Sequence, residues 1–202
     1  MKPLITFLLL SLLVLEGCTP ILKLSYGIRQ PKQETPASIT RFLEKHEYPV
    51  ADQYIMKDSS AYVRLMSDSI LKSLLASPIF FRSDLKRIAR DTTHCQWSGG
   101  AQVQNLKKDT TYTCYDELNF SDIWPYIKPL SDTVVKPVVN PGDYDFILLY
   151  TWGSFMGKLN ERVFVVNDAI ETRPDLKILL VYLNFDMQKS WNLSKDQKYK
   201  LD

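Results

Sequence analysis

Hydrophobic residues towards the C-terminal end of the chain predict two buried strands joined by a helix. Residues 146–150 and 177–183 are short, almost wholly apolar runs, typical of strands covered on both faces. Between them, apolar residues recur at spacings of four, three and four, which predicts a helix over about residues 158–172. These residues are Leu159, Val163, Val166 and Ile170. Pro174 ends the helix, so the pattern predicts a βαβ unit with adjacent parallel strands.

The preceding part of the chain predicts two helices. Thr35 followed by Pro36 is typical of a helix start and predicts a helix through about Lys45. Asp58 predicts the start of a second helix, which ends before Pro78. The buried stripe of this second helix is expected to contain Tyr62, Val63, Met66, Ile70 and Leu74.

Short β-prone runs lie between and after these helices. Residues 53–56 and 112–115 predict brief strands, and residues 79–81 predict a strand that forms a hairpin with residues 86–92. Residues 98–100 predict a loop, and a short helix is expected to start at Asn119 or Ser121. The expected fold class is α/β, with α+β as the alternative, and with an N-terminal helical and β-hairpin portion.

The turn after the first strand of the βαβ unit, residues 152–157, is where such units tend to place ligands and catalytic groups. A tryptophan at this point resembles the core of a thioredoxin-like protein, a family that places Trp-Cys-x-x-Cys there. The resemblance implies a thioredoxin-like core, but it puts Gly153 and Met156 at the cysteine positions, where no thiolate can form. We therefore expect packing or a contact surface at this turn, formed by Trp152, Ser154 and Phe155.

The first residues of the chain predict export and lipid attachment. A short basic start leads into an apolar run over residues 4–15, which is typical of a signal-peptide core and short for a membrane span. The next residues, Leu15-Glu16-Gly17-Cys18, resemble a bacterial lipobox, in which the cysteine is acylated, commonly with palmitate, and becomes the new first residue. An ordinary secretory signal or an uncleaved anchor are the alternatives. The expected organisation is a signal peptide over 1–17, a lipidated tether over 18–35 and one globular domain over 36–202.

The residue after Cys18 is Thr19 instead of the aspartate associated with inner-membrane retention. This resemblance favours the outer membrane of the cell envelope, on its periplasmic face, over the inner membrane. The expected partners are the membrane, through the lipid anchor, and an envelope protein or small ligand that the sequence does not identify. A formal net charge of +2 is too small to indicate a nucleic acid as partner.

Two further cysteines, Cys95 and Cys114, flank a Gly-Gly pair. In an exported protein they predict a structural disulfide, which would stabilise the fold by roughly 3 kcal/mol in the chain-entropy model. A redox pair and two free thiols are the alternatives. With His94 and Asp116 the same cysteines could be imagined as a metal site, but their spacing matches no zinc pattern, and neither a metal nor a cofactor is expected.

Polar residues near the strand ends are the other candidates for chemistry. Ser154 does not match the Gly-x-Ser-x-Gly elbow of hydrolases and is expected to cap a helix. The carboxylates could hold a cation or transfer protons, although such residues are commonly solvated strand ends and caps. They are Asp143, Asp145, Glu161 and Asp186.

The chain as a whole resembles the small, uncharacterised lipoproteins of Bacteroidota-type bacteria. The residues that carry this resemblance are 15–18, Tyr26-Gly27-Ile28 with Pro31, and 144–157. No activity comes with it. The first hypothesis is a membrane-anchored, non-enzymatic binding or structural module. The second is a divergent thiol-redox or chaperone-like protein that uses Cys95 and Cys114, and the third is a hydrolase built around Ser154.

Overall fold

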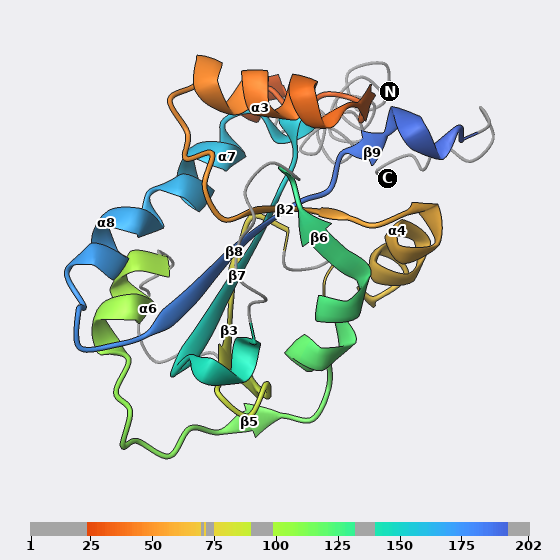
Figure 1. Ribbon diagram of the computed structural model, residues 1–202. Coiled ribbons are helices and arrows are strands. Elements are labelled where there is room, and N and C mark those ends of the chain that lie inside the picture. Colours follow the sequence, from red (N-terminus) through yellow and green to blue (C-terminus); the bar gives the residue numbers. More distant parts are fainter. Residues whose placement is uncertain (1–23, 70, 72–74, 90–98, 132–139, 194–202) are drawn as a thin grey trace, which may run out of the picture.

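A mixed seven-stranded sheet forms the centre of the computed structural model, which describes residues 24–69, 71, 75–89, 99–131 and 140–193 (Figure 1). The strand order is β5-β4-β3-β7-β8-β2-β6, and a separate parallel pair joins β1 to β9. The strands are β1 Gln33–Glu34, β2 Gln53–Met56, β3 Pro78–Arg82, β4 Arg87–Ile88, β5 Cys114–Tyr115, β6 Ile127–Pro129, β7 Phe146–Trp152, β8 Ile178–Asn184 and β9 Met187–Gln188. The fold is therefore of the α/β class.

The two long strands at the centre are adjacent and parallel, as the hydrophobic pattern predicted. β7 and β8 pair from Phe146 opposite Ile178 to Trp152 opposite Asn184. β2 continues the parallel part on the other side of β8, while β3 runs antiparallel to β7. Every residue of β7 is buried, which explains why the strand reads as a continuous apolar run.

Alternate residues of β7 enter two separate cores. Ile147 and Leu149 belong to the cluster that includes residues of α4 (Ser59–Met66). Leu148 and Tyr150 belong to the cluster on the other face, which includes residues of α3 (Pro36–Lys45) and α6 (Gly99–Asn105). The sheet is thus covered on both faces, in the three-layer arrangement common to α/β domains.

The connection from β7 to β8 is interrupted, whereas the sequence predicted one helix. It contains a 3-10 turn, η4 (Ser154–Met156), and two short helices, α7 (Leu159–Phe164) and α8 (Val166–Glu171). Val163, Phe164 and Val166 are all buried, while Val165 is 59% exposed. The break falls at this exposed valine, which lies between the end of α7 and the start of α8, and buried residues lie on both sides of it.

The two N-terminal helices begin where the capping residues predicted. Thr35 and Ser38 form a reciprocal capping box at the start of α3, and Asp58 accepts a hydrogen bond from the Ala61 N–H at the start of α4. The buried side of α4 differs from the prediction, because Val63 is 41% exposed and Leu65 is buried in its place.

Residues 99–105 form helix α6, where the sequence predicted a loop over 98–100. Gly99 lies against the Tyr150 side chain so closely that a Cβ atom would collide with its hydroxyl. Glycine is required here for close packing against the sheet rather than for a turn. Arg173 donates to three carbonyls at the end of this helix, those of Val103, Gln104 and Leu106, and so satisfies groups that the helix leaves free.

The hairpin of β3 with β4 is present, and residues 90–92 of its expected second strand lie outside the described residues. β5 occupies the last two residues of the predicted 112–115 strand. The expected short helix near residue 120 is two 3-10 turns, η1 (Phe120–Asp122) and η2 (Trp124–Tyr126). Two further turns are η3 (Pro141–Asp143) and η5 (Lys189–Trp191).

Candidate functional site

The carboxyl ends of β7 and β8 lie at the upper edge of the sheet in Figure 1, beside the turn that begins at Trp152. Trp152 is fully buried, and its indole Nε1 donates a 2.9 Å hydrogen bond to Oε1 of Gln53 on β2. Its ring stacks on Phe42 of α3 and meets Phe164 of α7 edge-on. The tryptophan therefore joins two strands and two helices at this edge.

Asp186, just beyond β8, is a buried carboxyl that contacts the turn through Ser154. Its carboxylate accepts hydrogen bonds of 2.9 Å from both the backbone N–H and the hydroxyl of Ser154, and one of 2.8 Å from Nδ2 of Asn184. The side chain is 1% exposed. Burial raises the pKa of Asp186 to about 6, even though the hydrogen bonds from Ser154 and Asn184 act in the opposite direction.

Two further buried amides bind backbone carbonyls of the turn and of Asp186. Asn160 on α7 donates from Nδ2 to the Gly153 carbonyl at 2.9 Å, and Gln188 on β9 donates from Nε2 to the Asp186 carbonyl at 3.0 Å. Oδ1 of Asn160 and Oε1 of Gln188 are buried and have no hydrogen-bond partner among the described residues. We use the term carboxyl-edge cluster for these buried polar residues: Gln53, Asn160, Asn184, Asp186 and Gln188.

The N-terminal part of the described chain covers the turn. The Lys158 N–H donates to the Tyr26 carbonyl, and the Arg29 N–H donates to the Phe155 carbonyl, both at 2.8 Å. Gly157 has φ +56°, and a Cβ there would collide with the carbonyls of Tyr26 and Gly27. Residues 24–29 are therefore held on the turn by backbone hydrogen bonds and close contact, and we call them the docked segment.

A side-chain contact adds to this docking. Arg162 of α7 donates from Nη2 to the Tyr26 hydroxyl at 3.0 Å, and its guanidinium lies 5.3 Å from the centre of the Tyr26 ring. Residues 24–35 had been expected to belong to a tether. The structure packs this part on the body, and it continues into β1, which pairs with β9.

Of the expected contact surface of Trp152, Ser154 and Phe155, only Ser154 is partly exposed. Trp152 and Phe155 lie inside the core, where they pack against other side chains instead of forming a contact surface. Ser154 is the first residue of η4, which has Gly153 as its N-cap and no side-chain cap, and the Ser154 hydroxyl donates to Asp186. His46, at the end of α3, stacks on Tyr48 and lies tilted against Phe42.

The candidate carboxylates are not brought together. Only Asp186 reaches the turn. Asp145 lies at the other end of β7, where it accepts from the Lys177 N–H and pairs with Lys108 at 2.8 Å, and Asp143 belongs to η3 beside it. Glu161 is exposed on α7.

The cysteine predictions fall partly outside the described residues, because Cys18, His94 and Cys95 lie there. Cys114 is half-buried on β5, with its Sγ 3.7 Å from the Tyr112 carbonyl, and forms no disulfide within the described residues. In the part of the chain that the structure describes, no three His, Cys, Asp or Glu residues form a group that could hold a metal ion.

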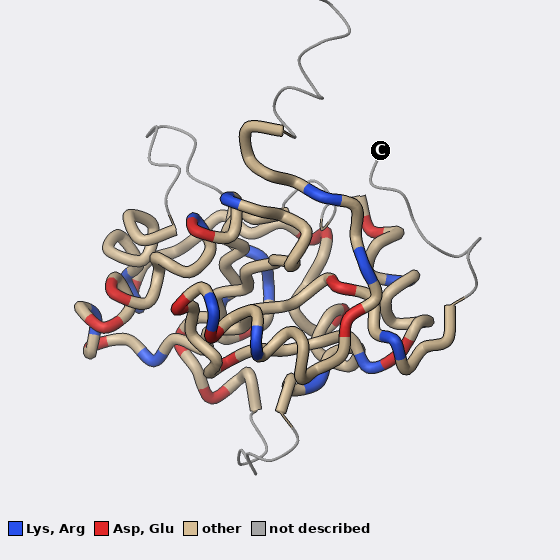
Figure 2. Tube along the Cα trace, turned by 90° about the horizontal axis from the view of Figure 1, so that it is seen from above, with Lys and Arg blue, Asp and Glu red and all other residues tan. Residues whose placement is uncertain are grey.

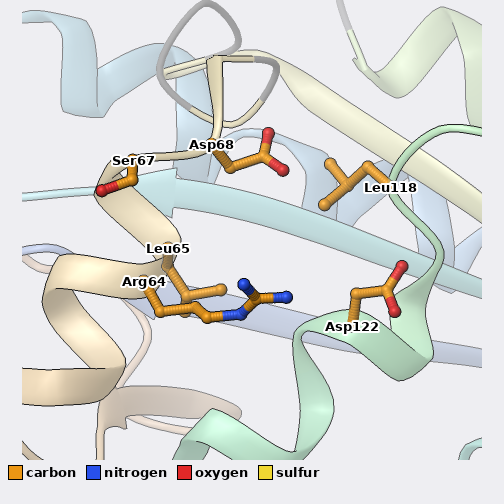
Figure 3. Close-up of a pocket in the computed structure, with 6 residues that line it drawn as sticks. All are labelled: Arg64, Leu65, Ser67, Asp68, Leu118 and Asp122. Carbon is orange, nitrogen blue, oxygen red and sulfur yellow. The ribbon is translucent and has the colours of Figure 1, made fainter.

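A shallow pocket of about 200 Å³ lies elsewhere, between the end of α4 and η1 (Figure 3). Arg64 and Asp122 face each other across it, but its groups have structural roles. Asp122 accepts from the Asn119 N–H, Asp68 accepts from the Leu71 N–H, and Arg64 lies over the Tyr126 ring. The carboxyl-edge cluster, with a buried carboxylate and two unpaired oxygens, is the stronger candidate.

Sequence reasoning placed the turn and missed most of the cluster. Gln53 and Asn160 lie in segments that read as a strand and an amphipathic helix, and a buried tryptophan that needs an acceptor was the one available signal. No protein-family model, curated protein or solved structure matches the chain. Within the described residues, no helix is both long and apolar enough to cross a membrane.

Replacing Trp152 tests the packing role of the turn. Trp152→Ala removes a fully buried ring and is expected to lower the free energy of unfolding by about 3–5 kcal/mol. Trp152→Phe keeps most of the ring but leaves Oε1 of Gln53 without its donor, at an expected cost of about 1–3 kcal/mol. Urea denaturation measures both values. Two variants as stable as the wild type would contradict the assignment.

The Asp186 carboxyl predicts a specific pH dependence. Its pKa of about 6 in the folded protein exceeds the ordinary value of 3.8, so its contribution to stability is present below pH 4 and lost as the pH rises through 6. Asp186→Asn is neutral throughout. Its unfolding free energy relative to wild type should therefore rise by about 2 kcal/mol between pH 4 and pH 7.

Urea denaturation across this pH range measures the difference. Asp168→Asn, on the exposed side of α8, controls for the loss of one carboxylate. An equal change in the control variant would contradict the role assigned to burial of Asp186.

Proposed function

We propose that this chain is a lipid-anchored protein of the bacterial cell envelope whose folded domain is a non-catalytic binding or structural module. The observation that carries the proposal is the state of the turn at the carboxyl edge. Catalytic βαβ units leave this position open to a ligand. Here the docked segment covers the turn, Phe155 and Met156 are buried, and both donors of Ser154 are occupied by Asp186.

We further propose that the core is thioredoxin-like and lacks the redox site of that family. The parallel pairing of β7 with β8, and the position of Trp152 at the end of β7, support this. The antiparallel hairpin β3–β4 lies beside β7, although it precedes the βαβ unit in the chain instead of following it. Gly153 and Met156 stand where the two cysteines of the family would be.

The lipid anchor is proposed at Cys18, on the periplasmic face of the outer membrane. The apolar run over residues 4–15 and the Leu-x-Gly-Cys pattern support it. The docked segment begins at Leu24, six residues after Cys18, and is held on the body by the hydrogen bonds of Tyr26 and Arg29. An anchor at Cys18 would therefore be joined to the domain by a short connection.

Thiol chemistry at Cys114 is the weaker proposal. Cys114 is half-buried on an edge strand, as a reactive thiol requires. Cys114 pairs with Ile88 of β4. The neighbouring Arg87 pairs with Phe81 of β3, and Phe81 pairs with Ile147 near the start of β7. The thiol is thus at the opposite end of the sheet from Trp152, by about 15 Å along β7, and cannot use the turn.

Acylation of Cys18 tests the proposed anchor. Mass spectrometry of the mature protein should find a diacylated or triacylated cysteine as the first residue, because the lipobox resemblance places cleavage before Cys18. Cys18→Ala should abolish the acyl mass and release the protein from the membrane fraction. Cys114→Ala is the control and should remain membrane-bound. An intact Met1 or an unmodified amino terminus elsewhere would overturn this part of the proposal.

The absence of a thiol at the turn predicts no disulfide-exchange activity there. The purified protein should not reduce insulin through residues 152–157. Any activity that appears should be unchanged by Ser154→Ala and lost with Cys114→Ser, because Cys114 is the thiol that the weaker proposal uses. Reductase activity that disappears with Ser154→Ala would contradict the non-catalytic assignment of the turn.

A further inference from the structure

We infer that the docked segment holds the carboxyl-edge face of the domain against the lipid bilayer. This inference rests on the proposed acylation of Cys18. The face comprises the docked segment, α3, the start of α7, and η5, which lie at the upper side of the domain in Figure 1. The partner is the surface of the same bilayer that receives the acyl chains.

The reach of the chain supplies the first argument. An undocked chain from Cys18 to Thr35 would extend about 60 Å and would let the domain take any orientation. The docked segment shortens this connection to the steps from Cys18 to Leu24, which extend at most about 20 Å. The parallel strand β7 alone is about 20 Å long. Only the carboxyl-edge face is therefore always within reach of the bilayer.

The exposure of Leu24 supplies the second argument. It is 84% exposed, the highest value among the large hydrophobic residues that the structure describes as exposed, and it begins the docked segment. An apolar side chain at this point is stabilised by the boundary between headgroups and acyl chains, which an acylated Cys18 would bring near. In contrast, basic and acidic residues are interspersed when the domain is viewed from above (Figure 2), so charge attraction does not set the orientation.

The docked segment is also attached to the body through more than one kind of contact. The two backbone hydrogen bonds, the close contact with Gly157 and the Arg162–Tyr26 contact fix the segment at several points. The pairing of β1 with β9 then secures the residues that follow. The orientation of the domain relative to the lipid anchor is therefore restricted by these contacts, which a flexible tether would not do.

Lysine labelling on vesicles tests the orientation with the natural protein. The acylated chain is reconstituted into vesicles of phosphatidylethanolamine and phosphatidylglycerol and treated with a water-soluble acetylating reagent, and mass spectrometry reads each lysine. Three exposed lysines at the carboxyl-edge face should react several-fold more slowly than two exposed lysines at the other end of the strands. The first group is Lys32, Lys158 and Lys189, and the second is Lys86 and Lys177.

Variants of two matched tyrosines complete the test. Tyr26→Ala combined with Gly157→Ala removes the contact with Arg162 and places a Cβ against the carbonyls of Tyr26 and Gly27, and should bring the slow lysines several-fold closer to the rates of the others. Arg162→Ala removes the same contact from the other side and should act in the same direction. Tyr115→Ala, which removes the comparable Arg87–Tyr115 contact at the far end of the sheet, should leave the pattern unchanged.

The outcomes separate the two proposals. Equal labelling of both lysine groups in an acylated, vesicle-bound protein would overturn the orientation and leave the lipid anchor standing. A chain that carries no acyl group and does not bind vesicles would overturn both. Protection of the first group that is lost in the Tyr26→Ala, Gly157→Ala variant and kept in Tyr115→Ala is the expected result.

Discussion

Burial of β7 on both faces is the constraint on which the rest of the structure depends. The strand pairs along its length with β3 and β8, and its alternate residues enter two cores. A strand in this position must have every backbone group paired and every side chain covered. The helices on either face, and the glycine at position 99 that lets α6 approach Tyr150, follow from the need to cover it.

The same burial places polar groups out of contact with water where β7 ends. The indole N–H of Trp152 and the carboxylate of Asp186 are buried there, and burial of unpaired polar groups would cost several kcal/mol. Gln53, Ser154 and Asn184 supply the missing partners from neighbouring strands and from the turn. Asn160 and Gln188 each keep one oxygen without a partner among the described residues, so it is the paired groups, Gln53, Ser154 and Asn184, that favour one arrangement of the turn.

The docked segment covers the turn at this edge and binds to its backbone. Gly157 in a left-handed conformation brings the backbone of the turn against the carbonyl of Tyr26, an approach that any side chain would prevent. The position at which a βαβ unit would offer a nucleophile is instead the place where the domain receives its own N-terminal chain. The segment occupies the Lys158 N–H and the Phe155 carbonyl, two backbone groups at the end of the turn.

The sequence by itself determined the features that depend on local pattern. The apolar runs placed β7 and β8, and Thr35 and Asp58 placed the starts of α3 and α4, because strand burial and helix capping are short-range effects. Only the tertiary structure decided the rest. Gly99 was predicted to lie in a loop, but it starts α6 and packs against Tyr150. Gln53 can accept from Trp152 because β2 pairs with β8, which is adjacent to β7. The docking of residues 24–29 depends on a contact with residues more than a hundred positions away, which no local pattern encodes.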